Sequence, residues 1–199
     1  MKKVRLAITG NIGSGKSVVS RMLAIMGIPV YDCDSRAKYL MCNDAALKSA
    51  IVRMFGEDSY TASGELNKGW LAARIFTDKD NIARMNALVH PCVKRDFVDW
   101  AATMPGKIVA VESAILYESG MIDTVDKVLL VWADKDTSIA RTMKRGGLTL
   151  SQVESRLQNQ MSADELLLLS DYSIFNDGDT AVLPKLVEIV EHLQNKNID

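Results

Sequence analysis

The chain has 199 residues, and its 24 lysines and arginines nearly balance 25 aspartates and glutamates. Binding to a phosphate backbone needs a clear basic excess, so this balance argues against a nucleic-acid partner. No apolar stretch approaches the roughly 20 residues of a membrane span, and we expect no secretory signal. Three cysteines at no metal-ligand spacing suit a reducing compartment. These features predict a cytoplasmic, soluble protein, a monomer or weak homo-oligomer.

The first elements in chain order are a strand, a glycine-rich loop, a helix and a second strand. Residues 4–9 are apolar and few, which predicts a strand buried on both faces of a sheet. Apolar residues recur at helical spacing over 18–26, and Gly27 stands where a glycine ends a helix. Residues 28–31 predict the second strand. This order is typical of two parallel strands joined by a right-handed crossover.

The middle of the chain, from residue 35 to about residue 104, has a helical composition with no clear strand. Pro91 and Pro105 are expected to interrupt the helices there. Such a long excursion between two strands of one sheet predicts a helical insertion.

Strands and helices alternate in the second half of the chain. Strands are predicted over 107–112, 127–132 and 172–175, and helices over 136–145, 151–169 and 183–193. The pattern as a whole predicts an α/β fold with a five-stranded parallel sheet flanked by helices.

The loop after the first strand matches the phosphate-binding motif G-x-x-x-x-G-K-[ST] at every position: Gly10, Asn11, Ile12, Gly13, Ser14, Gly15, Lys16 and Ser17. Its backbone N–H groups, together with that of Val18, would cradle phosphate at the positive end of the helix dipole. Lys16 would reach the β- and γ-phosphates of ATP, and the Ser17 hydroxyl would ligate Mg²⁺. The motif predicts a P-loop NTPase-type fold.

Other motifs narrow the class of nucleotide protein. A GTPase should carry D-x-x-G and N-K-x-D, and neither is present in the sequence. The chain is too short for a large motor or transporter ATPase. A small-molecule kinase fits best, with the nucleoside, nucleotide and shikimate kinases as alternatives. A regulator that binds ATP without transferring phosphate is the alternative from another class.

Two carboxylates follow the second predicted strand. Asp32 and Asp34 lie two residues apart, so a continuing strand would point both to the same side. Phosphoryl transfer to an alcohol needs a carboxylate that accepts the hydroxyl proton. We assign that base to Asp34, and to Asp32 the support of Mg²⁺ through water. The alternative is that one of them only caps a helix beginning at Ser35.

A basic helix end supplies the third part of a kinase site. Arg141 and Arg145 are four residues apart and share a helix face, just before Gly146 and Gly147. They could close over the triphosphate and neutralise charge in the transition state, with the glycine pair as a hinge. A solvated basic face at a helix C-terminus is the alternative.

Nearly the whole chain resembles the dephospho-CoA kinase family. The resemblance rests on ordered motifs: 8–17, Tyr31–Asp34, Leu88–Pro91, Ile115–Glu118, Arg141–Arg145, Arg156 with Gln160, and Asn176–Gly178. The family motifs carry a second loop glycine, a threonine, a proline and a lysine where this chain has Asn11, Val18, Ala114 and Leu166.

The resemblance implies an activity and further site residues. Members transfer a phosphoryl group from ATP to the ribose 3′-hydroxyl of dephospho-CoA, which gives CoA and ADP in the last step of CoA biosynthesis. Asp34 corresponds to the family's catalytic base, and Asn176 would lie close to the adenine of ATP. Acceptor contacts are implied for His90, Leu116, Glu118 and Gln160. For His90 a structural role at a helix end is the alternative.

These inferences combine into one predicted organisation. The nucleotide-binding core comprises residues 1–58, 105–142 and 167–199. A helical acceptor-binding insertion covers 59–104, and a lid covers 143–166.

Overall fold

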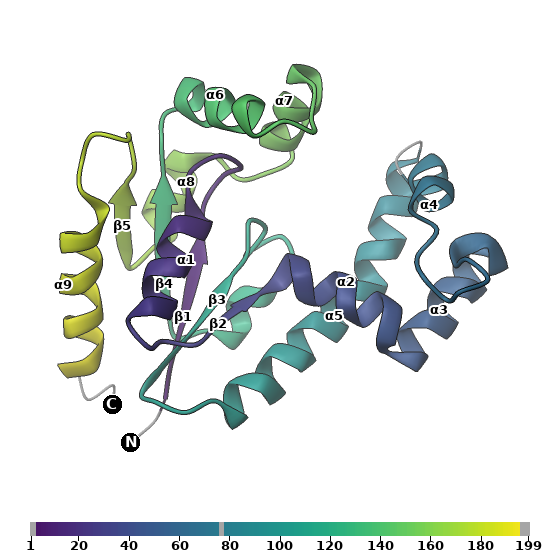
Figure 1. Cartoon of the computed structure of the whole chain (residues 1–199), viewed down its shortest axis with the longest axis horizontal. Coiled ribbons are helices and arrows are strands. Elements are labelled where there is room, and N and C mark those ends of the chain that lie inside the picture. The colour runs from purple at the N-terminus through teal and green to yellow at the C-terminus, as the bar shows by residue number, and fades with distance from the viewer. Residues whose placement is uncertain (1–2, 76–77, 196–199) are drawn as a thin grey trace. The chain divides into compact units, whose positions relative to one another are not determined.

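The computed structural model describes residues 3–75 and 78–195 (Figure 1). Contacts between Cα atoms divide the chain into two compact units, residues 1–32 with 101–199 and residues 33–100. The sequence prediction began the insertion at residue 59, whereas the second unit begins at residue 33.

The first unit contains a five-stranded parallel sheet in the order β2-β3-β1-β4-β5. Its strands are β1 (Val4–Thr9), β2 (Val30–Asp32), β3 (Ile108–Glu112), β4 (Lys127–Trp132) and β5 (Tyr172–Phe175). The predicted α/β fold with five parallel strands is therefore confirmed. The second strand begins two residues later than predicted and ends one residue later, because Val30 rather than Ile28 enters the ladder with β3.

Helices of the first unit cover the sheet and extend from its carboxyl edge. They are α1 (Lys16–Ile25), η2 (Met121–Thr124), α6 (Lys135–Arg145), α7 (Leu150–Gln158), α8 (Ala163–Leu169) and α9 (Val182–Asn195). Helices α1 and α9 pack on one face, where Leu23 and Leu186 meet Leu6 and Ile8 of β1. The alternate residues of β1, such as Ala7, are equally buried, so this strand is covered on both faces as predicted.

The predicted helix over 151–169 is wrong in one respect, because the structure has two helices there. Ser162 begins α8 with a capping box, in which its hydroxyl accepts from the Glu165 N–H and the Glu165 carboxylate accepts from the Ser162 N–H. Thr149 and Gln152 form the same box at the start of α7. Each box satisfies N–H groups that have no partner inside the helix, which stabilises a new helix start.

The second unit is helical, with α2 (Cys33–Asn43), α3 (Ala45–Phe55), η1 (Glu57–Ser59), α4 (Lys68–Ile75) and most of α5 (Lys79–Thr103). Asp44 caps α3 by accepting a hydrogen bond from the Leu47 N–H at 2.8 Å. Pro91 was expected to break a helix, but it lies inside α5. This helix has 25 residues in total and continues on both sides of the proline. A long helix tolerates one such position at the cost of one backbone hydrogen bond. No helix among the described residues is both long and apolar enough to cross a membrane.

Candidate functional site

The phosphate-binding loop joins β1 to α1, and its glycines are required by their surroundings. Gly10, Gly13 and Gly15 all have positive φ angles, of 145°, 82° and 96°. A Cβ atom on Gly10 would collide with the Val131 carbonyl oxygen, and one on Gly13 with the Ser138 carbonyl oxygen. The loop therefore packs tightly on the end of β4 and on α6, in a backbone conformation that favours glycine.

Lys16 lies over the loop that precedes it. Its Nζ atom donates hydrogen bonds to the carbonyl oxygens of Gly10, at 2.8 Å, and of Asn11, at 3.1 Å. The ammonium group is thus held inside the turn of the loop, beside the N-terminus of α1. The phosphate contact of Lys16 stays a prediction, and the structure places its cation at the N-terminus of α1, against two carbonyl oxygens of the loop.

Asn176 connects the phosphate loop to helix α6. Its backbone carbonyl accepts a hydrogen bond from Arg141 Nη1 at 2.7 Å, and its amide Nδ2 donates to the Ser14 carbonyl at 2.9 Å. A Cβ atom on Gly178 would lie 3.1 Å from Arg141 Nη2, so the segment after β5 also packs on the guanidinium. Arg141 and Asn176, which were predicted separately, are therefore neighbours. Arg145 lies exposed on the last turn of the same helix.

Gln160 and Glu118 are both engaged with protein groups. Gln160 Oε1 accepts from the Ile12 N–H at 3.0 Å, and Gln160 Nε2 donates to the Ala114 carbonyl at 3.1 Å. Glu118 Oε1 accepts from the Met161 N–H at 3.1 Å. Leu116 is only 1% exposed, so its side chain belongs to the core, and its acceptor contact stays a prediction.

Two carboxylates lie in register at the carboxyl edge of the sheet. Asp32 at the end of β2 pairs with Glu112 at the end of β3, and Glu112 also pairs with Ile8 of the phosphate-loop strand. The sequence analysis missed Glu112, although an acidic residue that ends a buried strand beside that loop is a usable signal. Ser17 is exposed in the first turn of α1. Carboxylate and hydroxyl oxygens of this kind suit Mg²⁺.

Asp34 and His90 belong to the second compact unit. Helix α2 begins at Cys33, so Asp34 lies in its first turn and is not the cap of a helix starting at Ser35. For the same reason strand alternation does not relate Asp34 to Asp32. Asp34 is exposed in that turn. His90 is half-buried in α5, and this burial lowers its pKa from the usual value.

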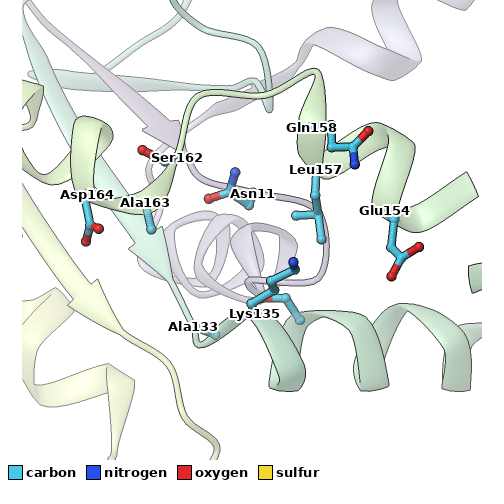
Figure 2. A pocket seen from close by; sticks show the side chains of 10 residues that line it. Asn11, Ala133, Lys135, Glu154, Leu157, Gln158, Ser162, Ala163 and Asp164 are labelled. Carbon is cyan, nitrogen blue, oxygen red and sulfur yellow. The ribbon is translucent and has the colours of Figure 1, made fainter. Parts of the chain in front are cut away.

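A cavity of about 540 Å³ opens between the phosphate loop and helices α6 and α7. It is lined by Asn11, by Lys135 and Ser138 of α6, by Glu154 and Leu157 of α7, and by Ser162 before α8. Figure 2 shows the Asn11 side chain between Leu157 and Ser162. Because α6 and α7 both border the cavity, its size depends on the angle that these helices make with the loop.

The parallel sheet, the complete phosphate-binding loop after β1 and the arginine-bearing helices after β4 define a P-loop kinase that acts on a small molecule. A family model described as dephospho-CoA kinase matches residues 4–181. The chain belongs to the dephospho-CoA kinase family.

Individual relatives agree with this assignment over nearly the full length. A dephospho-CoA kinase of Porphyromonas gingivalis is 37% identical over 194 residues, covering 97% of this chain and 96% of that protein. One of Bacteroides fragilis is 34% identical over 194 residues, covering 97% of this chain and 94% of its own. The crystal structure of TT1252 from Thermus thermophilus is similar at a TM-score of 0.84 and 30% identity, covering 96% of this chain and 98% of that one.

Membership of this family decides among the classes of nucleotide-binding protein that the sequence left open. The chain is an enzyme, a kinase with ATP as its phosphoryl donor, and it acts in CoA biosynthesis. A regulator that only binds ATP is not supported, and the nucleoside, nucleotide and shikimate kinases are not favoured.

Proposed function

We propose that the chain transfers the γ-phosphoryl group of Mg²⁺-bound ATP to the ribose 3′-hydroxyl of dephospho-CoA. A bond forms between the acceptor oxygen and the γ-phosphorus, the bond from that phosphorus to the β–γ bridging oxygen breaks, and the hydroxyl proton leaves to a carboxylate. The products are CoA and ADP. The observation that carries the proposal is the phosphate loop, in which Lys16 Nζ is held by two loop carbonyls at a helix N-terminus.

The loop binds the β- and γ-phosphates in this proposal. Its backbone N–H groups supply dipoles that are already oriented, so little reorganisation is needed as charge moves during transfer. Lys16, whose Nζ atom bonds to two loop carbonyls, supplies positive charge at the loop. Gly13 and Gly15 keep the backbone close to α6 and Asn176, where a Cβ atom has no room.

Mg²⁺ fits the oxygen donors at the edge of the sheet. The Ser17 hydroxyl would ligate the ion, and Asp32 would support it through water, with Glu112 as its neighbour in register. Mg²⁺ usually keeps several waters and uses one or two carboxylates together with the phosphates of the nucleotide. When bound, it neutralises part of the phosphate charge.

Asp34 is the proposed base. Its carboxylate orients the acceptor hydroxyl and takes its proton as the bond to phosphorus forms. Support comes from its position in the first turn of α2, two residues beyond the end of β2, and from its match to the family motif.

Arg141 and Arg145 are the proposed lid arginines. Arg141 is placed by the Asn176 carbonyl, which holds its guanidinium beside the phosphate loop. Arg145 is exposed one helical turn further along α6. Their charge would stabilise the transferring phosphoryl group, while the lid, residues 143–166 by sequence, excludes water.

The acceptor is proposed to bind in the helical insertion, residues 59–104 by sequence. His90 would shape that site from α5 without acid–base chemistry. Glu118 and Gln160 are proposed acceptor contacts from the first unit, although both also bond to protein groups.

The proposal is tested by measuring ADP release with ATP and Mg²⁺ for a set of acceptors at matched concentrations. Dephospho-CoA is compared with adenosine, AMP, CMP and shikimate, and CoA is identified by mass. We expect stimulation by dephospho-CoA alone, with one CoA formed for each ADP. Stimulation by another acceptor only would refute the proposed acceptor, and no stimulation by any would refute the transfer reaction.

A further inference from the structure

Asn11 stands in the phosphate loop where the resembling family motif has a second glycine. The backbone at this position does not require glycine, because no residue other than glycine has a positive φ among the described residues. A side chain is therefore permitted at position 11, and its contacts show what it does.

The Asn11 amide reaches the connection between α7 and α8. Its Nδ2 atom donates a hydrogen bond to the Met161 carbonyl oxygen at 2.9 Å. The next loop residue, Ile12, donates its N–H to Gln160 Oε1 at 3.0 Å. Two consecutive loop residues thus bind two consecutive residues of the connection.

The same two connection residues also form hydrogen bonds with the segment after β3. Gln160 Nε2 donates to the Ala114 carbonyl at 3.1 Å, and the Met161 N–H donates to Glu118 Oε1 at 3.1 Å. We call these four hydrogen bonds the 160–161 clasp. It joins three segments of the first unit, all of them far apart in sequence.

The clasp binds the C-terminal end of the lid, at residues 160–161, and other contacts bind helix α6, which leads into the lid. At the start of α6, a Cβ atom on Gly13 would collide with the Ser138 carbonyl oxygen, and further along the helix Arg141 bonds to the Asn176 carbonyl. The part of α6 that carries both lid arginines, and the whole of α7, lie along the chain between Ser138 and the clasp. Their angle to the phosphate loop is therefore set by two anchors, one at each end.

We propose that Asn11 is a positioning residue for phosphoryl transfer, which anchors the far end of the lid to the phosphate loop through its bond to Met161. The proposal rests on the proposed kinase function of the lid arginines. Arg141 and Arg145 stabilise charge that develops during transfer, whereas ATP in the ground state is held mainly by loop N–H groups and Lys16. A loosened lid therefore lowers kcat more than it weakens ATP binding.

The test compares two substitutions at position 11 with a matched control. Asn11→Ala removes the amide, and Asn11→Asp keeps its shape but places an acceptor against the Met161 carbonyl. Asn159→Ala is the control, because Asn159 Nδ2 donates to the Ser155 carbonyl at 2.8 Å in the same connection without reaching the loop. Steady-state kinetics and hydrogen exchange of backbone amides in residues 135–158 are measured for each variant.

We expect Asn11→Ala to lower kcat about three- to tenfold, the range to which the net contribution of one hydrogen bond converts, with KM for ATP changed less than twofold. Asn11→Asp should be at least as slow. Exchange in residues 135–158 should be faster in both than in Asn159→Ala. A purely structural role would lower the melting temperature and leave kcat of the folded enzyme unchanged.

Either of two results overturns the inference. One is a kcat of Asn11→Ala or Asn11→Asp equal to that of Asn159→Ala, and the other is unchanged exchange in residues 135–158, whatever the activity. A wild-type chain that fails to phosphorylate dephospho-CoA would instead refute the proposed function, and exchange would still decide whether Asn11 anchors the lid.

Discussion

The amide of Asn176 occupies the space that a Cβ atom on Gly15 would need. Its Nδ2 atom donates to the carbonyl of Ser14 at 2.9 Å, and Gly15, the N-cap of α1, has a φ of 96°. The segment after β5 therefore packs directly against the phosphate loop. Any side chain at position 15 must displace Asn176, and with it the carbonyl that holds Arg141.

Gly15→Ala should therefore cost more than the strain of a left-handed backbone alone. Gly27→Ala is the matched control, because Gly27 has a φ of 80° with nothing within 4 Å of its Cβ position. We expect the control to lose about 1–2 kcal/mol of unfolding free energy with little change in turnover. Gly15→Ala should lose more stability and at least about 100-fold in kcat/KM for ATP, since the loop N–H groups move. Urea unfolding measures the loss of stability, and steady-state kinetics measures the loss of kcat/KM. Equal effects of the two variants would show that the contact of Gly15 with Asn176 does not matter.

Asp34→Asn should slow turnover by about 10²- to 10⁴-fold, because the amide cannot accept the acceptor proton. Asp44→Asn makes the same chemical change in the same compact unit, at the residue that caps α3. Asparagine caps a helix about as well as aspartate, so this control should keep its turnover and its stability. Rapid-quench measurement of CoA formation distinguishes the two variants. Wild-type turnover in Asp34→Asn would show that Asp34 is not the base.

Arg141→Met should lower kcat by about 100-fold or more, because it removes a charge proposed to act on the transferring phosphoryl group. It also removes the 2.7 Å hydrogen bond to Asn176. Lys144→Met removes a charge from the exposed last turn of the same helix and should change kcat less than about twofold. Similar small effects of both variants would favour a solvated basic face instead of a lid.

His90 predicts a pH dependence of stability. Burial lowers the pKa of His90, so the unfolded chain takes up the proton first as the pH falls. The contribution of neutral His90 to the free energy of unfolding is fully present above the pKa of histidine in the unfolded chain, about 6.5. It is lost as the pH falls through the lowered pKa of His90 in the folded chain. Urea midpoints of wild type should therefore drop more between pH 7.5 and 5.5 than those of His90→Gln. His192→Gln, which changes an exposed histidine of α9, should show the drop of wild type.

Much of the site could be predicted from local patterns. The apolar run 4–9 and the glycine-rich loop identified β1, the loop and the start of α1, because burial on both faces and positive φ angles each leave a signature within a few residues. The strands near 108–112 and 127–132 were predicted for the same reason, and that at 172–175 from its short run of strand-type residues. Two signals were present but unused, the capping box at Ser162 and the acidic end of β3 at Glu112.

Other relationships depend on residues that meet only in the folded chain. Asn11 and Met161 are 150 positions apart, and Ile12 and Gln160 are 148 apart. No local periodicity records such a hydrogen bond, since its geometry follows from the strand order and from the angle at which the lid leaves β4. Leu116 likewise matched a site motif, yet packing buried it. The chemistry of the phosphate loop could thus be predicted from residues adjacent in sequence, whereas tertiary packing alone decided which groups hold that loop in place.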